Sequence, residues 1–200
     1  MKIFDVRTQR VEDAIEEAAR VVFAGGTLVY PDETGYVVAC DSHRDGVAVV
    51  YAAAAAAGAS VSLCVASATE LLEFAADNAL AAIAVRRLAV EPVTFIVRRP
   101  ACLEYLRGAE SVVAFRVPED PLARMLLDRC GPLVTSATSY TGAGLEGLPH
   151  VDVLLDRGEI AQRREASVVD LTGDRARLVF EGAVPFDRLL SRFGALEYPR

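Results

Sequence analysis

Apolar residues along the chain follow a helical spacing in some segments and form short β-branched runs in others. Segments of the first kind, with capping residues or glycines at their ends, predict helices. The predicted helices cover residues 11–24, the stretch from Asp41 or Ser42 to Gly58, and residues 67–74, 78–88, 120–128 and 185–193. Segments of the second kind predict strands at residues 27–30, 61–65, 93–97, 112–117, 153–155, 167–171 and 178–180.

Local signals mark where these elements begin and end. The residues expected to cap helix N-termini are Asp41 or Ser42, Ser67, Asn78 and Asp120. Gly25 and Gly26 follow the first helix as a C-cap would, and strand 27–30 is expected to end at Pro31. Leu133 and Val134 lead into a polar stretch, TSATSYTGAG.

The order of these elements predicts the fold class. Helices and strands alternate in the first part of the chain, and strands crowd together in the later part. One twisted mixed sheet with helices packed around it accounts for this order. No repeat, linker or low-complexity tail divides the sequence, so we predict a single α/β domain over residues 1–200.

Composition excludes several classes of protein. Hydrophobic residues make up 52% of the 200 positions, with 14 glycines and 9 prolines, so the chain is neither disordered nor fibrous. Its apolar runs are shorter than a membrane span requires. The first residues, MKIFDVRTQRVEDAIEE, carry acids where a signal peptide has an apolar core. We therefore expect a cytoplasmic protein.

Cysteine and histidine offer little for metal binding or nucleophilic catalysis. The four cysteines are scattered among apolar neighbours and are expected to be buried, reduced thiols: Cys40, Cys64, Cys102 and Cys130. The two histidines, His43 and His150, are far apart in the sequence. We therefore expect no zinc site and no Ser-His-Asp triad.

The net charge of −7 argues against a broad basic surface for nucleic acid, because non-specific affinity comes from neutralised phosphates. Four arginines remain candidates for a local basic groove: Arg86, Arg87, Arg98 and Arg99. The alternative is that each is a solvated end of a helix or strand.

Five short stretches carry a resemblance to a known family. They are GGTLVYPDETGYVVACD, EPVTFIV, AFRVPEDP, PLVTSATSYTG and ASVVDL followed by LVFEGAVP. Their order and spacing resemble the YrdC/TsaC-like family of threonylcarbamoyl-AMP synthases over about residues 10–185. The Gly-Tyr of TGYVVAC and the missing Asn after TSA look closer to the YciO-like branch.

The resemblance implies a YrdC-like domain with a concave ligand cleft. It also implies a reaction in which L-threonine, bicarbonate and ATP, with Mg²⁺, give threonylcarbamoyl-AMP and pyrophosphate for the modification of tRNA. A carbamate anion must approach a phosphate anion in that reaction, so the site needs fixed cations and hydrogen-bond donors. The family has also been linked with nucleotide and double-stranded RNA binding.

Residues that match the family motifs are candidate ligand contacts, and no catalytic residue is assigned. The candidates are Thr34, Tyr36, Thr94, Arg116, Thr135, Ser136, Thr138 and Ser167. Each also has a structural interpretation: strand packing for Thr94, an ion pair for Arg116, and a turn stabilised by hydroxyls for Thr135, Ser136 and Thr138.

Departures from the motifs concern charge. Where the family has a K-x-R-P loop, this chain has Ala54–Gly58, which predicts that the second helix extends through the loop. The other departures are Asp32 for Thr, Glu91 for Gly, Thr138 for Asn and Glu181 for Arg. Three positive charges are therefore absent and three negative charges are added. Losing two phosphate-binding side chains should cost roughly 3–6 kcal/mol. The added carboxylates should increase this loss unless a divalent cation bridges them to phosphate.

Three hypotheses follow. The first is a divergent family member that keeps a cleft for a small ligand, nucleotide or RNA, with weak or absent synthase activity. The second is a working synthase whose missing cations are supplied by Arg98, Arg99 or Arg163. The third is a non-catalytic interaction or RNA-binding protein, which the net charge makes less favourable than small-ligand binding.

Overall fold

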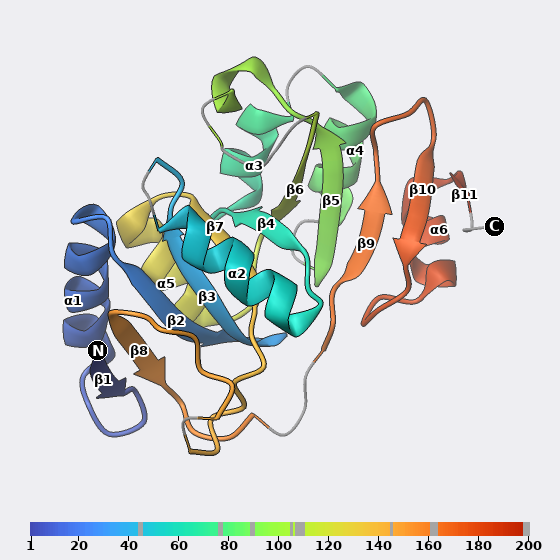
Figure 1. Cartoon of the computed structure of the whole chain (residues 1–200). Helices are drawn as coiled ribbons and strands as arrows, with labels where there is room; N and C mark the ends of the chain where they lie inside the picture. Colours follow the sequence, from blue (N-terminus) through green and yellow to red (C-terminus); the bar gives the residue numbers. More distant parts are fainter. Residues whose placement is uncertain are drawn as a thin grey trace.

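A computed structural model describes residues 1–43, 46–75, 78–88, 91–104, 106, 111–144, 146–160 and 164–197. One mixed sheet runs through this part of the chain, in the order β1-β8-β2-β3-β7-β4-β6-β5-β9-β10-β11 (Figure 1). The strands are β1 Lys2–Asp5, β2 Thr27–Asp32, β3 Gly35–Asp41, β4 Val61–Cys64, β5 Val93–Arg98, β6 Val112–Arg116, β7 Leu133–Ala137, β8 Val153–Asp156, β9 Ser167–Asp170, β10 Ala176–Phe180 and β11 Leu196–Glu197. The helices are α1 Val11–Phe23, α2 Val47–Ala57, α3 Ala68–Phe74, α4 Ala79–Leu88, α5 Pro121–Cys130 and α6 Phe186–Phe193, with a 3₁₀ turn at Ala101–Leu103.

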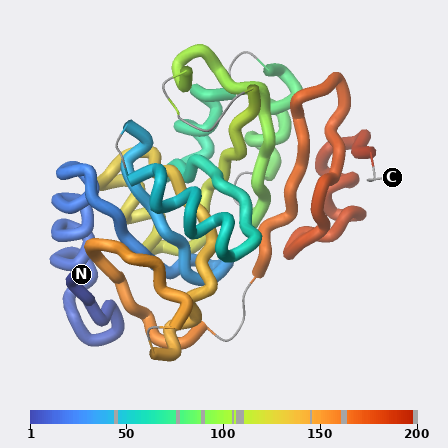
Figure 2. Tube along the Cα trace, viewed as in Figure 1, coloured from blue at the N-terminus to red at the C-terminus, as the bar shows by residue number. Residues whose placement is uncertain are grey.

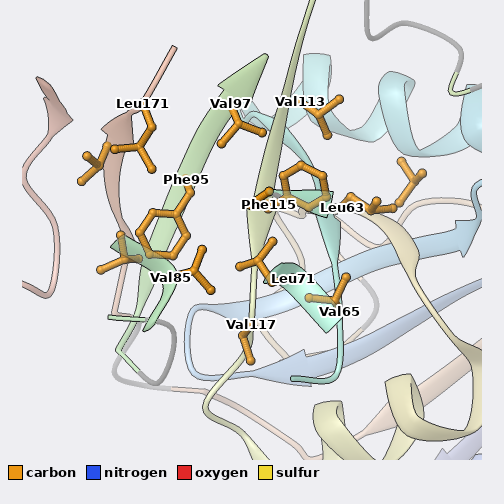
Figure 3. Close-up of a cluster of buried hydrophobic side chains, with 14 of the residues drawn as sticks. Leu63, Val65, Leu71, Val85, Phe95, Val97, Val113, Phe115, Val117 and Leu171 are labelled. Carbon is orange, nitrogen blue, oxygen red and sulfur yellow. The ribbon is translucent and has the colours of Figure 1, made fainter. Parts of the chain in front are cut away.

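The sheet separates two hydrophobic cores. Consecutive residues of a strand point to opposite faces, and in β2 the side chain of Leu28 joins one core and that of Val29 the other. The first core is completed by α1 and α5, and the second by α2, α3 and α4. Figure 3 shows part of the second core, where Phe95 and Phe115 pack among aliphatic side chains. The predicted α/β class with a mixed sheet is confirmed.

The ends of the chain lie at opposite ends of the sheet. β1 pairs in parallel with β8 at one edge, and β11 pairs with β10 at the other. Figure 2 shows the N-terminus and the C-terminal elements far apart in space. None of the helices in the described ranges combines the length and the apolar character needed to cross a membrane.

Most of the predicted helix caps are confirmed. The hydroxyl of Ser67 accepts from the N–H of Glu70, and the side chain of Asn78 accepts from the N–H of Ala81. The carboxylate of Asp120 caps α5. The prediction for α2 was wrong, because its N-cap is Gly46, with no side-chain hydrogen bond.

The predicted strands need three corrections. β2 does not end at Pro31 but continues to Asp32; proline is tolerated there because β8 pairs with β2 only at Leu28 and Val29. β7 continues through the polar residues to Ala137. Four strands are absent from the predicted set: β1, β3, β7 and β11.

The cysteine prediction holds only in part. All four thiols are free; Cys40 and Cys64 are buried, whereas Cys130 is half-buried and Cys102 is exposed. Burial raises the pKa of Cys40 to about 12. The exposure of Cys102 follows from its place in the short 3₁₀ turn after β5, outside both cores.

Candidate functional site

A hollow of about 560 Å³ opens on the sheet where β3, β5, β6 and β7 come together with the end of α2. We call it the hydroxyl cavity, because its lining includes Thr34, Ser60, Ser62, Thr94, Thr135, Ser136, Thr138 and Ser139. Six of the eight predicted site residues line it: Thr34, Thr94, Arg116, Thr135, Ser136 and Thr138. The motifs that are far apart in the sequence therefore meet at one place in the fold.

The tight hairpin between β2 and β3 carries one side of the cavity. Asp32 pairs with Gly35, whose φ of 127° lies in the region that favours glycine. The carboxylate of Asp32 accepts from both the N–H and the hydroxyl of Thr34, each at 2.7 Å. These bonds fix the loop that carries Glu33 and Thr34.

Arg116 is the cation that lines the cavity, and its guanidinium is already paired with a carboxylate. Its guanidinium is buried and forms an ion pair with the buried carboxylate of Asp32. The same group donates to the hydroxyl of Thr34 at 3.1 Å and lies 3.7 Å from a carboxylate oxygen of Glu33. One cation thus faces two carboxylates.

The pKa values of this cluster follow from burial and from the neighbouring charges. Burial and the negative charge of Asp32 raise the pKa of Glu33, against the opposing effect of Arg116. Burial alone would lower the pKa of Arg116, but the carboxylates outweigh it and hold the guanidinium charged. The other oxygen of Glu33 accepts from the N–H groups of Glu119 and Asp120, each at 3.1 Å.

The hydroxyls of β7 and the loop after it bond to neighbouring strands. Thr135 contacts the hydroxyl of Ser62 and the thiol of Cys64, each at 3.1 Å. Ser136 donates to the carbonyl of Ser60 at 3.2 Å, and Thr138 donates to a β3 carbonyl at 3.1 Å. Ser136 and Thr138 can each accept a further bond, whereas Thr135 already has three contacts, because its hydroxyl also donates to the carbonyl of Ser62 at 3.3 Å.

Thr94 differs from these residues. It lies on β5 directly opposite Arg116 of β6 and is half-buried. Among the described residues, nothing hydrogen-bonds its hydroxyl. Within this lining, Thr94 is therefore well placed to contact a ligand.

Two predicted residues lie outside the lining. The Tyr36 hydroxyl donates to Asp156 and accepts from the N–H of Arg157, which ties β3 to the segment after β8. The Ser167 hydroxyl donates to the carbonyl of Val184 at 2.7 Å and accepts from the N–H groups of Gly182 and Val184. A ligand contact by Tyr36 or Ser167 stays a prediction, and both side chains already have structural partners.

Replacing Ser167 by Ala is expected to lower the free energy of unfolding by about 2 kcal/mol. The change leaves a carbonyl and two N–H groups without the hydroxyl that satisfies them, in a fully buried position. Urea unfolding monitored by circular dichroism measures the effect. An unchanged transition midpoint would contradict this structural role.

The alanine-rich segment is helical through to its end, as predicted. α2 ends at Ala57, and Gly58 forms its left-handed C-cap with φ of 63°. Ala57, Gly58 and Ala59 line the cavity where cations were expected. Arg116 and Glu165 are the only charged residues among the described residues that line it.

The predicted reversal of charge was wrong in its extent. Glu91 is not in the cavity lining; it forms an ion pair with Arg188 at 2.9 Å. Glu181 is also outside the lining, and its carboxylate accepts from the N–H of Phe186 at the start of α6. Asp32 is not in the lining either; of the three added carboxylates it alone bonds to lining residues, Arg116 and Thr34.

The arginines proposed as substitutes lie elsewhere or are not described. Arg98 and Arg99 line a different hollow, beside α4 and the turn after β9, and Arg98 donates to the carbonyl of Thr172 at 2.9 Å. Arg163 lies outside the described residues. Across the described ranges, no cluster of three or more His, Cys, Asp or Glu residues is arranged to hold a metal ion.

Sequence reasoning missed part of the lining. Ser60 and Ser62 were not singled out; Ser60 directly precedes β4 and Ser62 lies in it, and both line the cavity. Val179 and Phe180 of β10 also line the cavity and are partly exposed, at 45% and 44%. They bring apolar surface to its rim.

Comparisons with known proteins agree with this architecture. The family model Sua5_yciO_yrdC, described as telomere recombination, matches residues 20–182. The threonylcarbamoyl-AMP synthase of Stutzerimonas stutzeri is 31% identical over 133 residues, which are 64% of this chain and 71% of that protein. A relative from Mycobacterium tuberculosis is 31% identical over 108 residues, and the match spans only half of the length of each protein.

Solved structures show the same fold. A double variant of P. abyssi Sua5 superposes with a TM-score of 0.84 at 21% identity, covering 100% of this chain and 62% of that one. P. abyssi Sua5 complexed with L-threonine gives 0.74 at 19% identity, covering 92% and 58%. E. coli YciO gives 0.70 at 21% identity, covering 90% and 93%.

Proposed function

The chain belongs to the Sua5/YciO/YrdC family, and from this premise we propose that it binds a small ligand while synthesising threonylcarbamoyl-AMP weakly or not at all. The relatives named as synthases make that reaction the natural expectation. The hydroxyl cavity, however, holds the polar groups for a small molecule without the positive charge for a polyanion.

One observation carries the proposal. Arg116, the only cation among the described residues of the lining, is paired with Asp32 and lies 3.7 Å from Glu33. Bound phosphates require fixed positive charge, and each charge-assisted hydrogen bond contributes roughly 1.5–3 kcal/mol. The residues present therefore do not fit the triphosphate of ATP.

The same lining suits a small polar ligand. Thr94 and Ser136 offer hydroxyls that donate or accept, and the cavity of about 560 Å³ has room for an amino acid. P. abyssi Sua5, which shares this fold, was solved in complex with L-threonine. We propose L-threonine as the first ligand to test.

A pyrophosphate-release assay with L-threonine, bicarbonate, ATP and Mg²⁺ tests the loss of activity. The S. stutzeri synthase, assayed in parallel, is the reference. At ATP concentrations below the KM of the reference, we expect a rate at least a hundred times lower for this chain, because two missing phosphate-binding cations at roughly 1.5–3 kcal/mol each cost about two to four decades of ATP affinity. Turnover within a few-fold of the reference would overturn the proposal.

RNA binding stays an alternative that the cavity does not favour. The formal net charge is −7, and the described cavity lining has one arginine that is already paired. We propose small-ligand binding ahead of tRNA or double-stranded RNA binding for that reason. Steeply salt-dependent association with tRNA at low ionic strength would reverse this order.

A further inference from the structure

A second hollow, of about 440 Å³, lies between α2 and the strands β4 and β6. We call it the aliphatic pocket, because alanine, valine, leucine and isoleucine side chains make up most of its lining. It shares Ala59, Ser60, Ser62 and Ile96 with the hydroxyl cavity. Because these four residues belong to both, the two hollows adjoin, and we refer to them together as the groove.

The aliphatic pocket exists because α2 presents short side chains there. Ala54 and Ala55 line it from the helix, and neither side chain extends beyond Cβ. On the opposite wall, Val112 of β6 is 43% exposed although it is a large apolar residue. This apolar surface is exposed to water and lies beside a polar cavity. Such a surface indicates a binding site in which the ligand covers the exposed apolar side chains.

Charge and polarity restrict the ligand. The described lining of the aliphatic pocket contains no charged residue; its polar side chains are Tyr51, Ser60 and Ser62. In the adjoining cavity, Arg116 is paired with Asp32, and the exposed carboxylate of Glu165 adds a negative charge to the lining, so both features disfavour an anion. The groove thus presents hydroxyls and one carboxylate at one end and hydrocarbon at the other.

We propose that this groove binds a small molecule with a hydrogen-bonding carboxamide head on an aliphatic chain. The head, of the carboxamide class, lies among the hydroxyls of Thr94 and Ser136, and the chain occupies the aliphatic pocket. A carboxamide both donates and accepts hydrogen bonds, which matches hydroxyls that do the same. This inference rests on the proposed function, because it names the ligand class for the same cavity.

Linear primary carboxamides from propanamide to hexanamide test the proposal, with binding measured by ligand-observed NMR. Each added methylene is expected to lower the dissociation constant about fourfold, as hydrocarbon leaves water. Hexanamide should also bind more tightly than hexanoate, because Arg116 is already paired with Asp32 and the carboxylate of Glu165 repels an anion. A flat series, tighter binding of hexanoate than of hexanamide, or no binding by any amide would overturn the inference.

Two substitutions in α2 provide a matched pair. Ala55 lines the aliphatic pocket and Ala56 does not, although both are exposed alanines of the same helix. Leucine is a good helix former at either position, and thermal unfolding of both variants verifies folding. Ala55→Leu should abolish the dependence on chain length, and Ala56→Leu should preserve it. Equal behaviour of the two variants would refute placement of the chain in this pocket.

The outcomes separate this inference from the proposed function. If the amide series fails while L-threonine binds and pyrophosphate release stays low, the ligand class is wrong and the proposed function stands. If pyrophosphate release matches the reference synthase, the proposed function fails whatever the amides do.

Discussion

The double substitution Ala57→Lys and Ala59→Arg is expected to raise the affinity for ATP with Mg²⁺ by about two to four orders of magnitude. Both positions line the hydroxyl cavity at the end of α2 and have the K-x-R spacing of the family loop. Two charge-assisted hydrogen bonds to phosphate contribute roughly 3–6 kcal/mol together, which corresponds to that range of affinity. Isothermal titration calorimetry on both proteins measures the gain.

The control changes the net charge equally without changing the cavity. Ala52 and Ala56 are exposed alanines of α2 that line neither hollow, so Ala52→Lys with Ala56→Arg adds two positive charges elsewhere. A general electrostatic attraction would raise ATP affinity in both double variants alike. Equal gains, or no gain at the cavity positions, would contradict the view that missing local cations limit phosphate binding.

Helix ends could be predicted from sequence because their signals are local. Ser67 and Asn78 each bond to an N–H three residues further along the chain, and the sequence contains both partners. Strand β3 was not predicted, because its sequence lacks a comparable local signal. Its residues are buried on both faces of a central strand, so the polar alternation of a half-buried strand is absent.

The arrangement of charges could not be predicted because it depends on distant pairs. Asp32 and Arg116 are 84 residues apart and meet only when the sheet forms, and Glu91 meets Arg188 in the same way. Counting carboxylates along the motifs assumed that all of them face the ligand. Thr34, Thr94 and Ser136, which come from separate motifs, line the same cavity, and their contact with a ligand stays a prediction.

Replacing Arg116 by Met is expected to lower the free energy of unfolding by about 3–5 kcal/mol. The substitution keeps a long side chain but leaves the buried carboxylates of Asp32 and Glu33 without their cation. Removing one partner of a buried ion pair costs more than the net contribution of the pair, because the other charge stays desolvated. Urea unfolding at neutral pH, analysed with a constant m-value, measures the loss.

Protonation and a second substitution show that charge is the cause of this loss. Burial and Asp32 already raise the pKa of Glu33 above its ordinary 4.5, and removing Arg116 takes away the effect that lowers it. A carboxyl group whose pKa is raised on folding destabilises the folded state as the pH rises above its ordinary value of 4.5. The stability lost in Arg116→Met should therefore become smaller as the pH is lowered. Adding Asp32→Asn should likewise recover part of the stability. It removes one unpaired buried charge and keeps an oxygen that accepts hydrogen bonds from Thr34. A deficit that is the same at every pH and in the double variant would assign the loss to packing, and it would contradict the view that the charge of Arg116 is neutralised by Asp32 and Glu33.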